Sequence, residues 1–160
     1  MSDVSIGKPV PEFAATATGG RNLHLSDFRH KNIVLYFYPK DSTPGCTREG
    51  QDFRDQIGAF AQLNTVILGV SQDGLRSHEK FKAAQCFPFE LLSDEDATLC
   101  RQYGVLKEKN RYGKKVLGIE RSTFLIDSSG VLRREWRNVK VDGHVKEVLA
   151  AVKQLQESAP

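Results

Sequence analysis

The sequence has little of several features that define specialised classes of protein. Its 160 residues include three cysteines, too few for a scaffold held together by disulfides. The longest apolar run, residues 33–38, is much shorter than the roughly 20 residues of a membrane-spanning helix. The first residues hold neither a basic nor an apolar segment of the kind found in signal peptides. We therefore expect a cytoplasmic protein with reduced cysteines and no membrane partner.

The sequence also lacks the short motifs of several kinds of site. It has no C-x-x-C pair, no histidine pair at metal-ligand spacing and no glycine-rich nucleotide loop. We expect no metal and no bound cofactor. The net charge of +3 is small, and the basic cluster at residues 107–115 lies in no nucleic-acid-binding motif. This cluster is predicted to be a solvated loop, and no nucleic acid partner is expected.

What is present is an alternation of strand and helix signals along a chain of one-domain length. Continuous apolar runs predict buried strands at residues 32–38 and 65–71. A helix is predicted to begin at Pro44, with Thr43 as its N-cap, and its apolar stripe continues to Phe60. The remaining predicted elements are a helix at 75–85 capped by Asp73, a strand at 87–93, a helix at 97–103, strands at 122–127 and 131–136, and a helix at 143–156. This order predicts an α/β fold with a mixed central sheet flanked by helices. The thioredoxin-like fold fits it, although periodicity alone does not separate that fold from other α/β folds.

Cys46 differs from the other cysteines in its position. It follows a buried strand and lies in the first turn of the predicted helix, where free backbone N–H groups and the helix dipole favour a thiolate over a thiol. The thiolate is the reactive form of cysteine. Thr43 brings a hydroxyl to the same turn, where it can donate to the sulfur or to an incoming oxygen, and Pro39 closes the end of the strand against water. The competing interpretation is an inert cysteine that fills the junction between strand and helix.

The stretch from Pro39 to Thr47, P-K-D-S-T-P-G-C-T, matches the pattern P-x-x-x-[TS]-x-x-C of peroxiredoxin active sites. Four further stretches match one branch of that family: G-K-P-V-P-E-F, L-L-S-D, E-K-N-R-Y-G-K and G-I-E-R-S-T-F-L-I-D. Together these stretches span nearly the whole chain. The sequence therefore resembles the bacterioferritin comigratory, or PrxQ-type, branch of the peroxiredoxins. The resemblance implies one peroxiredoxin domain over residues 1–160, a thioredoxin-like fold and a thiol-dependent peroxidase.

The resemblance also implies a role for each residue of the site. Cys46 is expected to attack the O–O bond of the peroxide and to become a sulfenic acid. Thr43 is expected to hydrogen-bond the peroxide oxygen, Pro39 to shield the site, and Arg121 to supply a cation beside the thiolate. A guanidinium suits that position because it does not lose its charge. Glu49 is a candidate to orient Arg121, although an exposed glutamate in a first helical turn has nearly equal warrant.

Two departures from the family pattern concern how the sulfenic acid is resolved. Gln51 stands where many PrxQ proteins have a resolving cysteine, and Lys82 stands where another subgroup has one. We therefore expect a one-Cys enzyme that an external thiol resolves. Cys86 is a candidate resolving residue, through a disulfide with Cys46 that requires local unfolding, and Cys100 is a weaker one. The simpler interpretation of Cys86 and Cys100 is that each is a small buried apolar residue.

The reaction implied by the resemblance is reduction of hydrogen peroxide and small organic hydroperoxides by a thiol. Thioredoxin, glutaredoxin and glutathione remain open as the reductant. A monomer is expected, since members of this branch are often monomeric. One competing function is a redox-sensing binding module, in which oxidation of Cys46 changes a partner surface without turnover. Another, a thioredoxin-like disulfide reductase, is disfavoured because Thr43 occupies the place of the first cysteine of a C-x-x-C motif.

Overall fold

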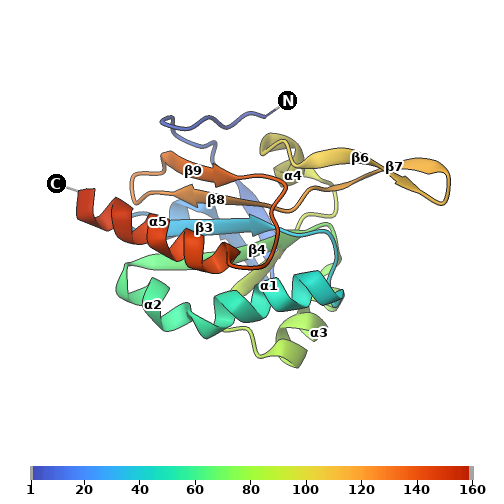
Figure 1. Ribbon diagram of the computed structural model, residues 1–160, viewed down its shortest axis with the longest axis horizontal. Coiled ribbons are helices and arrows are strands. Elements are labelled where there is room, and N and C mark those ends of the chain that lie inside the picture. The colour runs from blue at the N-terminus through green and yellow to red at the C-terminus, as the bar shows by residue number, and fades with distance from the viewer. Residues whose placement is uncertain (1, 159–160) are drawn as a thin grey trace.

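The computed structural model describes residues 2–158, which contain a seven-stranded sheet with helices on both faces (Figure 1). The strands of this sheet are β1 (Ala14–Ala17), β2 (Arg21–His24), β3 (Asn32–Phe37), β4 (Thr65–Ser71), β5 (Glu90–Ser93), β8 (Ser122–Ile126) and β9 (Leu132–Trp136). The helices are η1 (Leu25–Phe28), α1 (Pro44–Asp55), α2 (Ile57–Gln62), α3 (Leu75–Gln85), α4 (Thr98–Gln102) and α5 (His144–Ser158). The strand order is β2-β1-β5-β4-β3-β8-β9. Because β3, β4 and β5 run parallel and the other pairs antiparallel, the predicted mixed sheet is confirmed.

The central strand β3 separates two parts of the core. Ile33, Leu35 and Phe37 face the part that includes α4, whereas Val34 and Tyr36 face the part built with α1, α2, α3 and α5. Every residue of β3 is buried. A strand covered on both faces has no solvent-facing positions, which explains why it reads as an uninterrupted apolar run in the sequence.

The helix that begins at Pro44 is interrupted, contrary to the prediction. Gln56 leaves the helical conformation, so α1 and α2 are separate helices. Phe53 and Phe60 nevertheless pack in the same core, with Ile57 partly buried against it. One irregular residue leaves the helical period readable, and the sequence pattern therefore gives no sign of the break.

Asp73 does not cap α3, contrary to the prediction. Gly74 is the N-cap of α3, and no side chain caps that helix end. The Asp73 carboxylate instead accepts hydrogen bonds from Ser71 Oγ at 2.7 Å and from the backbone N–H of Asp41 at 2.8 Å. Asp73 therefore ties the end of β4 to the loop that precedes α1.

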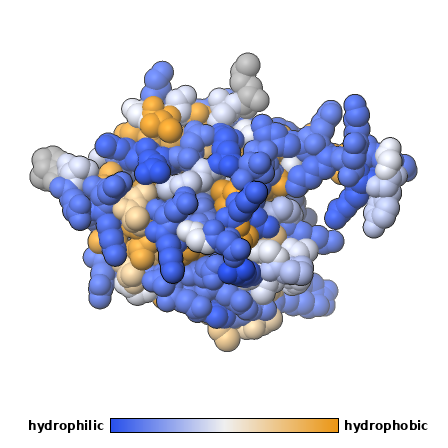
Figure 2. Space-filling view, in the orientation of Figure 1, coloured by the Kyte–Doolittle hydropathy of each residue, from blue (hydrophilic) through white to orange (hydrophobic). Residues whose placement is uncertain are grey.

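Residues 107–115 lie in a β-hairpin and not in the predicted loop. β6 (Leu106–Arg111) pairs with β7 (Lys114–Ile119) in a separate two-stranded sheet that projects from the body (Figure 1). Tyr112 and Gly113 have φ values of 51° and 76°, the positive values that a type I′ hairpin turn requires. Most of the hairpin is exposed, and Figure 2 shows the projection as mostly hydrophilic. With water on both faces, the strands lack the apolar alternation by which a strand is normally predicted.

The N-terminal hairpin of β1 and β2 is also absent from the prediction. Its strands are four residues each, and β1 is rich in alanine, a residue of low strand propensity. The strand predicted at 87–93 begins later, at Glu90. Within residues 2–158, no helix combines the length and the hydropathy needed to cross a lipid bilayer.

Candidate active site

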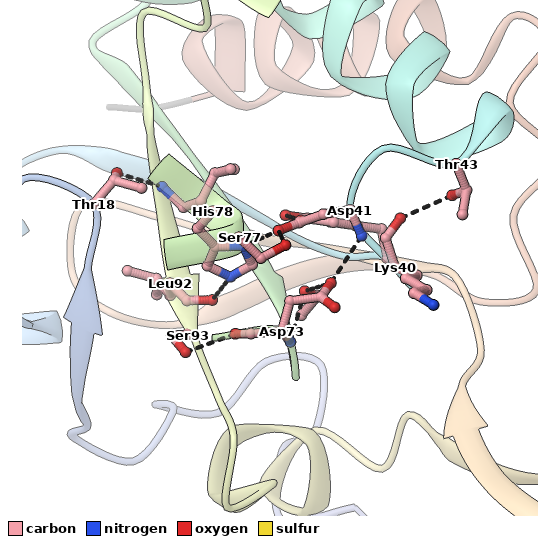
Figure 3. Close-up of polar contacts among 12 residues, drawn as sticks. Thr18, Lys40, Asp41, Thr43, Asp73, Ser77, His78, Leu92 and Ser93 are labelled. Atoms are coloured by element: carbon pink, nitrogen blue, oxygen red, sulfur yellow. Dashed lines mark hydrogen bonds and ion pairs between the residues drawn. The ribbon is translucent and has the colours of Figure 1, made fainter. Parts of the chain in front are cut away.

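The loop between β3 and α1 carries most of the residues that the sequence motif singled out. Cys46 is the third residue of α1 and is 2% exposed. Thr43 is the N-cap, and its carbonyl accepts a hydrogen bond of 2.8 Å from the N–H of Thr47. Its hydroxyl caps no helical N–H and donates instead to the carbonyl of Lys40 at 2.8 Å (Figure 3). The first turn of α1 therefore has no side-chain cap where it carries the sulfur.

Arg121 reaches the site from the link between β7 and β8. It immediately precedes β8, whose Ser122 pairs with Phe37, so Arg121 lies beside the carboxyl end of β3. Its Nη2 lies 3.5 Å from Cys46 Sγ, and its Nη1 donates to Glu49 Oε1 at 2.6 Å. Glu49 is fully buried, so its interpretation as an exposed first-turn residue is wrong. The structure thus brings the sulfur, the guanidinium and the carboxylate into one contact group.

Burial raises the pKa of Glu49 to about 7, although the charge of Arg121 and its hydrogen bond act to lower it. The second carboxylate oxygen of Glu49 is buried and has no hydrogen-bond partner. Burial acts to lower the pKa of Arg121, but Glu49 and Cys46 outweigh it and raise that pKa above its usual value. The guanidinium therefore stays charged beside the sulfur, while the Glu49 carboxyl titrates near neutral pH.

A cavity of about 340 Å³ adjoins Cys46, and its volume suits a small molecule. Thr43, Cys46 and Arg121 line one part of it. Pro39 also lines it and is itself exposed, so this proline belongs to the rim of the cavity. Lys40 and Gln72 line it too, and the β6–β7 hairpin supplies the largest part through residues 109–111 and 116–119, which were not assigned to the site from the sequence. The E-K-N-R-Y-G-K stretch that matched the family pattern includes residues 109–111 and is the sequence signal that could have found them.

Comparison with known proteins places the chain in a family. Residues 6–135 match the AhpC/TSA family. Peroxiredoxin Bcp of Bacillus subtilis is 49% identical over 154 residues, 96% of this chain and 98% of that protein. The chain belongs to the Bcp/PrxQ branch of the peroxiredoxins. It is accordingly a thiol-dependent peroxidase, as the resemblance implied.

Solved structures of this peroxiredoxin branch share the fold. A structure of the Xanthomonas campestris bacterioferritin comigratory protein is 49% identical, with a TM-score of 0.86 over 90% of this chain and 92% of that one. A structure of Xanthomonas campestris peroxiredoxin Q is 47% identical, with a TM-score of 0.89 over 97% of this chain and 99% of that one. The predicted thioredoxin-like fold is therefore confirmed.

In this peroxiredoxin a buried polar network holds the loop before α1 (Figure 3). Asp41 accepts hydrogen bonds from Tyr38 Oη at 2.6 Å and from Ser77 Oγ at 2.8 Å, and its Oδ2 lies 2.7 Å from His78 Nδ1. The other ring nitrogen of His78 lies 2.9 Å from the carbonyl oxygen of Leu92, which can only accept. Burial acts to raise the pKa of Asp41, but hydrogen bonds from His78 and Tyr38 outweigh it and lower that pKa. The ionised Asp41 therefore contacts Ser77 and His78 of α3, and these contacts fasten that helix to the loop.

Asp41, Asp73 and His78 form the one group in residues 2–158 whose ligand atoms are close enough to hold a metal ion, within 4.8 Å of one another. These atoms already have hydrogen-bond partners. Asp41 Oδ2 faces His78 Nδ1, and Asp73 Oδ2 accepts from the Asp41 backbone. We therefore interpret the group as a clamp on the loop that needs no ion to satisfy its polar atoms.

The three cysteines are free thiols with different surroundings. Cys100 is buried in the core, where burial and Asp94 raise the pKa of its thiol well above the usual value, so its predicted packing role is confirmed. The same prediction is wrong for Cys86, which is exposed at the left-handed C-terminal cap of α3, with a φ of 55°. The cap position turns its side chain away from the core. The neighbouring Gln85 side chain hydrogen-bonds Gln51 at 2.8 Å, so this helix end lies against the middle of α1.

Proposed function

We propose that Cys46 is the peroxidatic residue of this enzyme and that it cycles through a sulfenic acid. The observation that carries the proposal is the 3.5 Å contact between Arg121 Nη2 and Cys46 Sγ at the wall of a cavity. The cation and the N–H groups of the first turn of α1 stabilise a thiolate, the nucleophilic form of the side chain. The sulfur bonds to the nearer oxygen of the hydroperoxide, and the O–O bond breaks. The departing hydroxide or alkoxide, whose charge Arg121 stabilises, takes a proton from solvent.

Thr43 orients the hydroperoxide in this proposal. Its hydroxyl proton is committed to the carbonyl of Lys40, so its oxygen is left to accept a hydrogen bond from the O–H of the hydroperoxide. This acceptor role differs from the donor role that the sequence suggested. Pro39 supplies an apolar part of the rim that limits water at the site. Glu49 is a positioning residue, because its bond to one nitrogen of Arg121 directs the other nitrogen to the sulfur.

The proposed substrates are hydrogen peroxide and small organic hydroperoxides. The relative from Xanthomonas campestris has been studied for its alkyl peroxide reduction activity, which supports the second class. Thr43, Cys46 and Arg121 line one cavity without a second subunit, and we propose a monomeric enzyme. We also propose a cytoplasmic location, where cysteines stay reduced.

An external thiol completes the proposed cycle. It attacks the Cys46 sulfenic acid to give a mixed disulfide and water, and a second thiol then releases Cys46 and leaves as the oxidised disulfide. Gln51 offers no sulfur near Cys46, and Lys82 is paired with Glu90. Cys86 is exposed at the end of α3, whereas Cys46 is buried. These positions support external resolution over an internal disulfide.

Turnover of peroxide with a thiol reductant tests the proposal. Cys46→Ser is expected to abolish peroxide consumption, while Cys86→Ser and Cys100→Ser retain it when external thiol is in excess. Full activity of Cys46→Ser would overturn the role of Cys46. Loss of activity in Cys86→Ser, with the fold retained, would overturn external resolution. A single oxidation of Cys46 without further turnover would instead indicate a redox-sensing module.

A further inference from the structure

The charged residues that line the cavity beside Cys46 are all of one sign. Of the described residues that line it, Lys40, Lys109, Arg111 and Arg121 are cationic and none is acidic. Glu49 offsets the charge of Arg121. No ion pair within residues 2–158 involves Lys40, Lys109 or Arg111. Three cationic residues therefore line this space without a counterion from the described protein, and a concave surface lined by one sign of charge concentrates ions of the opposite sign.

Lys109 is the most firmly placed of these three cations. Its aliphatic chain lies across Gly118, where an added Cβ would come within 3.1 Å of it. Its ammonium group donates to the carbonyl oxygen of Ile119 at 2.7 Å. An ammonium has three N–H donors, so the group keeps donors for a ligand. Packing on Gly118 holds this charge at the cavity and leaves it less free to move in solvent.

The hairpin also gives the cavity an apolar part. Val116, Leu117 and Ile119 line it next to the cations. The first two side chains are 39% and 65% exposed, so they offer apolar surface that the protein itself leaves uncovered. A ligand that suits this lining has an anionic group and a short apolar body.

The depth of Cys46 limits the size of the molecule that reaches it. Cys46 is 2% exposed and adjoins a cavity of about 340 Å³. A small thiol fits a space of this volume. A thiol on the surface of another folded protein reaches this sulfur only if the loop or α1 rearranges.

We propose that the thiol that resolves oxidised Cys46 is a small molecule bearing a carboxylate, and that Lys109, with Arg111, binds this carboxylate. The inference rests on the proposed sulfenic acid at Cys46. The bound thiol attacks the sulfenic sulfur, the S–S bond forms and water leaves with the sulfenic oxygen. A second molecule of the same thiol attacks the mixed disulfide, which frees the Cys46 thiol and releases the symmetrical disulfide. The hairpin thereby becomes the specificity element of the reductive half of the cycle.

Two thiols of similar size, one anionic and one uncharged, test this inference. The protein is oxidised with one equivalent of hydrogen peroxide and mixed with mercaptopropionate or with the uncharged mercaptopropanol. Samples are quenched at short intervals with a sulfenic-acid trap, and the mass of the protein gives the fraction of Cys46 that is still a sulfenic acid. We expect Lys109→Met to slow the reaction of mercaptopropionate about fivefold, a typical upper value for one partly exposed ion pair, and to leave mercaptopropanol unchanged. In the unmodified protein, raising the salt concentration should lower the rate of reaction with mercaptopropionate relative to the rate with mercaptopropanol.

Lys115→Met is the matched control, since Lys115 lies on the same hairpin but does not line the cavity. An equal effect of Lys115→Met and Lys109→Met would overturn the inference, because it would show a general effect of net charge. If Lys109→Met slowed the reactions of the two thiols by the same factor, the inference would also be overturned.

One further measurement tests whether the carboxylate belongs to the hydroperoxide and not to the thiol. If Lys109→Met slows oxidation of Cys46 by a carboxylated hydroperoxide but not its reduction, the cavity selects the substrate and the inference about the thiol is wrong. If Cys46 forms no sulfenic acid at all, the proposed function itself fails, and this result is distinct from every outcome above.

Discussion

Glu49 accepts a hydrogen bond of 2.6 Å from Arg121, while its second carboxylate oxygen lies buried with no partner. The other nitrogen of the same arginine faces Cys46 Sγ. A carboxyl group that titrates near neutral pH therefore lies one helical turn from the sulfur. When Glu49 is neutral the charge of Arg121 is unopposed, and when Glu49 is ionised this charge is offset.

The raised pKa of Glu49 predicts how stability depends on pH. The pKa is 4.5 for an ordinary glutamate and about 7 in the folded protein. Between these values the folded protein holds a proton that the unfolded chain has lost, so this group makes the free energy of unfolding fall as pH rises. Glu49→Gln removes that component. Urea denaturation at about pH 5 and about pH 8 should show the variant gaining stability relative to the unmodified protein at the higher pH. The same difference at both pH values would contradict the assignment.

Arg121→Met is expected to slow the reaction of Cys46 with hydrogen peroxide about a hundredfold, the typical loss when one preorganised donor is removed from a developing oxyanion. Arg121→Lys should recover part of the rate, because an ammonium keeps the charge but lacks the forked geometry that serves Glu49 and Cys46 together. Stopped-flow oxidation of the reduced protein measures both. The exposed Arg133→Met is the control and should react like the unmodified protein. An unchanged rate in Arg121→Met would remove Arg121 from the site.

Substitutions in the clamp on the active-site loop are expected to lower the free energy of unfolding by unequal amounts. Asp41→Asn leaves His78 without its charged partner inside the protein, so a loss of about 3 kcal/mol is expected in the free energy of unfolding. Ser77→Ala removes one neutral donor and should cost about 1 kcal/mol. Urea denaturation of both variants measures the difference. Equal losses would show that the ionic contact between Asp41 and His78 has no special weight.

Two glycines of neighbouring helices provide a matched test of packing around α1. A Cβ on Gly50 would come within 2.3 Å of the Phe87 ring, so Gly50→Ala is expected to destabilise the protein by about 2 kcal/mol. Gly58 in α2 has no atom within 4 Å of the same position, so Gly58→Ala should stabilise it by about 0.5 kcal/mol through helix propensity. Thermal unfolding gives the sign of each effect. Stabilisation by Gly50→Ala would show that α1 does not pack against Phe87 as described.

The sequence predicted the parts of the molecule whose residues follow one period and one environment. β3 and β4 are continuous apolar runs, and both were predicted within one residue of their bounds. The β6–β7 hairpin was not predicted because water covers both of its faces and no apolar alternation marks it. The role of Asp73 was also wrong, since a cap is inferred from local spacing whereas Asp73 bonds a residue far away in the chain, Asp41.

The residues of the candidate site that lie within a sequence motif were predicted, and those outside it were harder to find. Cys46, Thr43 and Pro39 lie in one stretch, but Arg121 is far away in the sequence, just before β8. Physical reasoning on the sequence alone would have left it as a surface arginine. The family resemblance supplied the link between Cys46 and Arg121. The burial of Glu49 depends on tertiary packing, so no local pattern indicates it. The one sequence sign of Lys109 was its place in a stretch that matched the family pattern, and its position in the cavity also depends on tertiary packing.

The most direct test of the central claim is the intact mass of the fully reduced protein after one equivalent of hydrogen peroxide, with a sulfenic-acid trap present. The account predicts a single trapped adduct, located on Cys46. Loss of two hydrogens without an adduct would show an internal disulfide and contradict resolution by an external thiol. An unchanged mass would show that Cys46 does not react with peroxide, and the account of the site would be wrong.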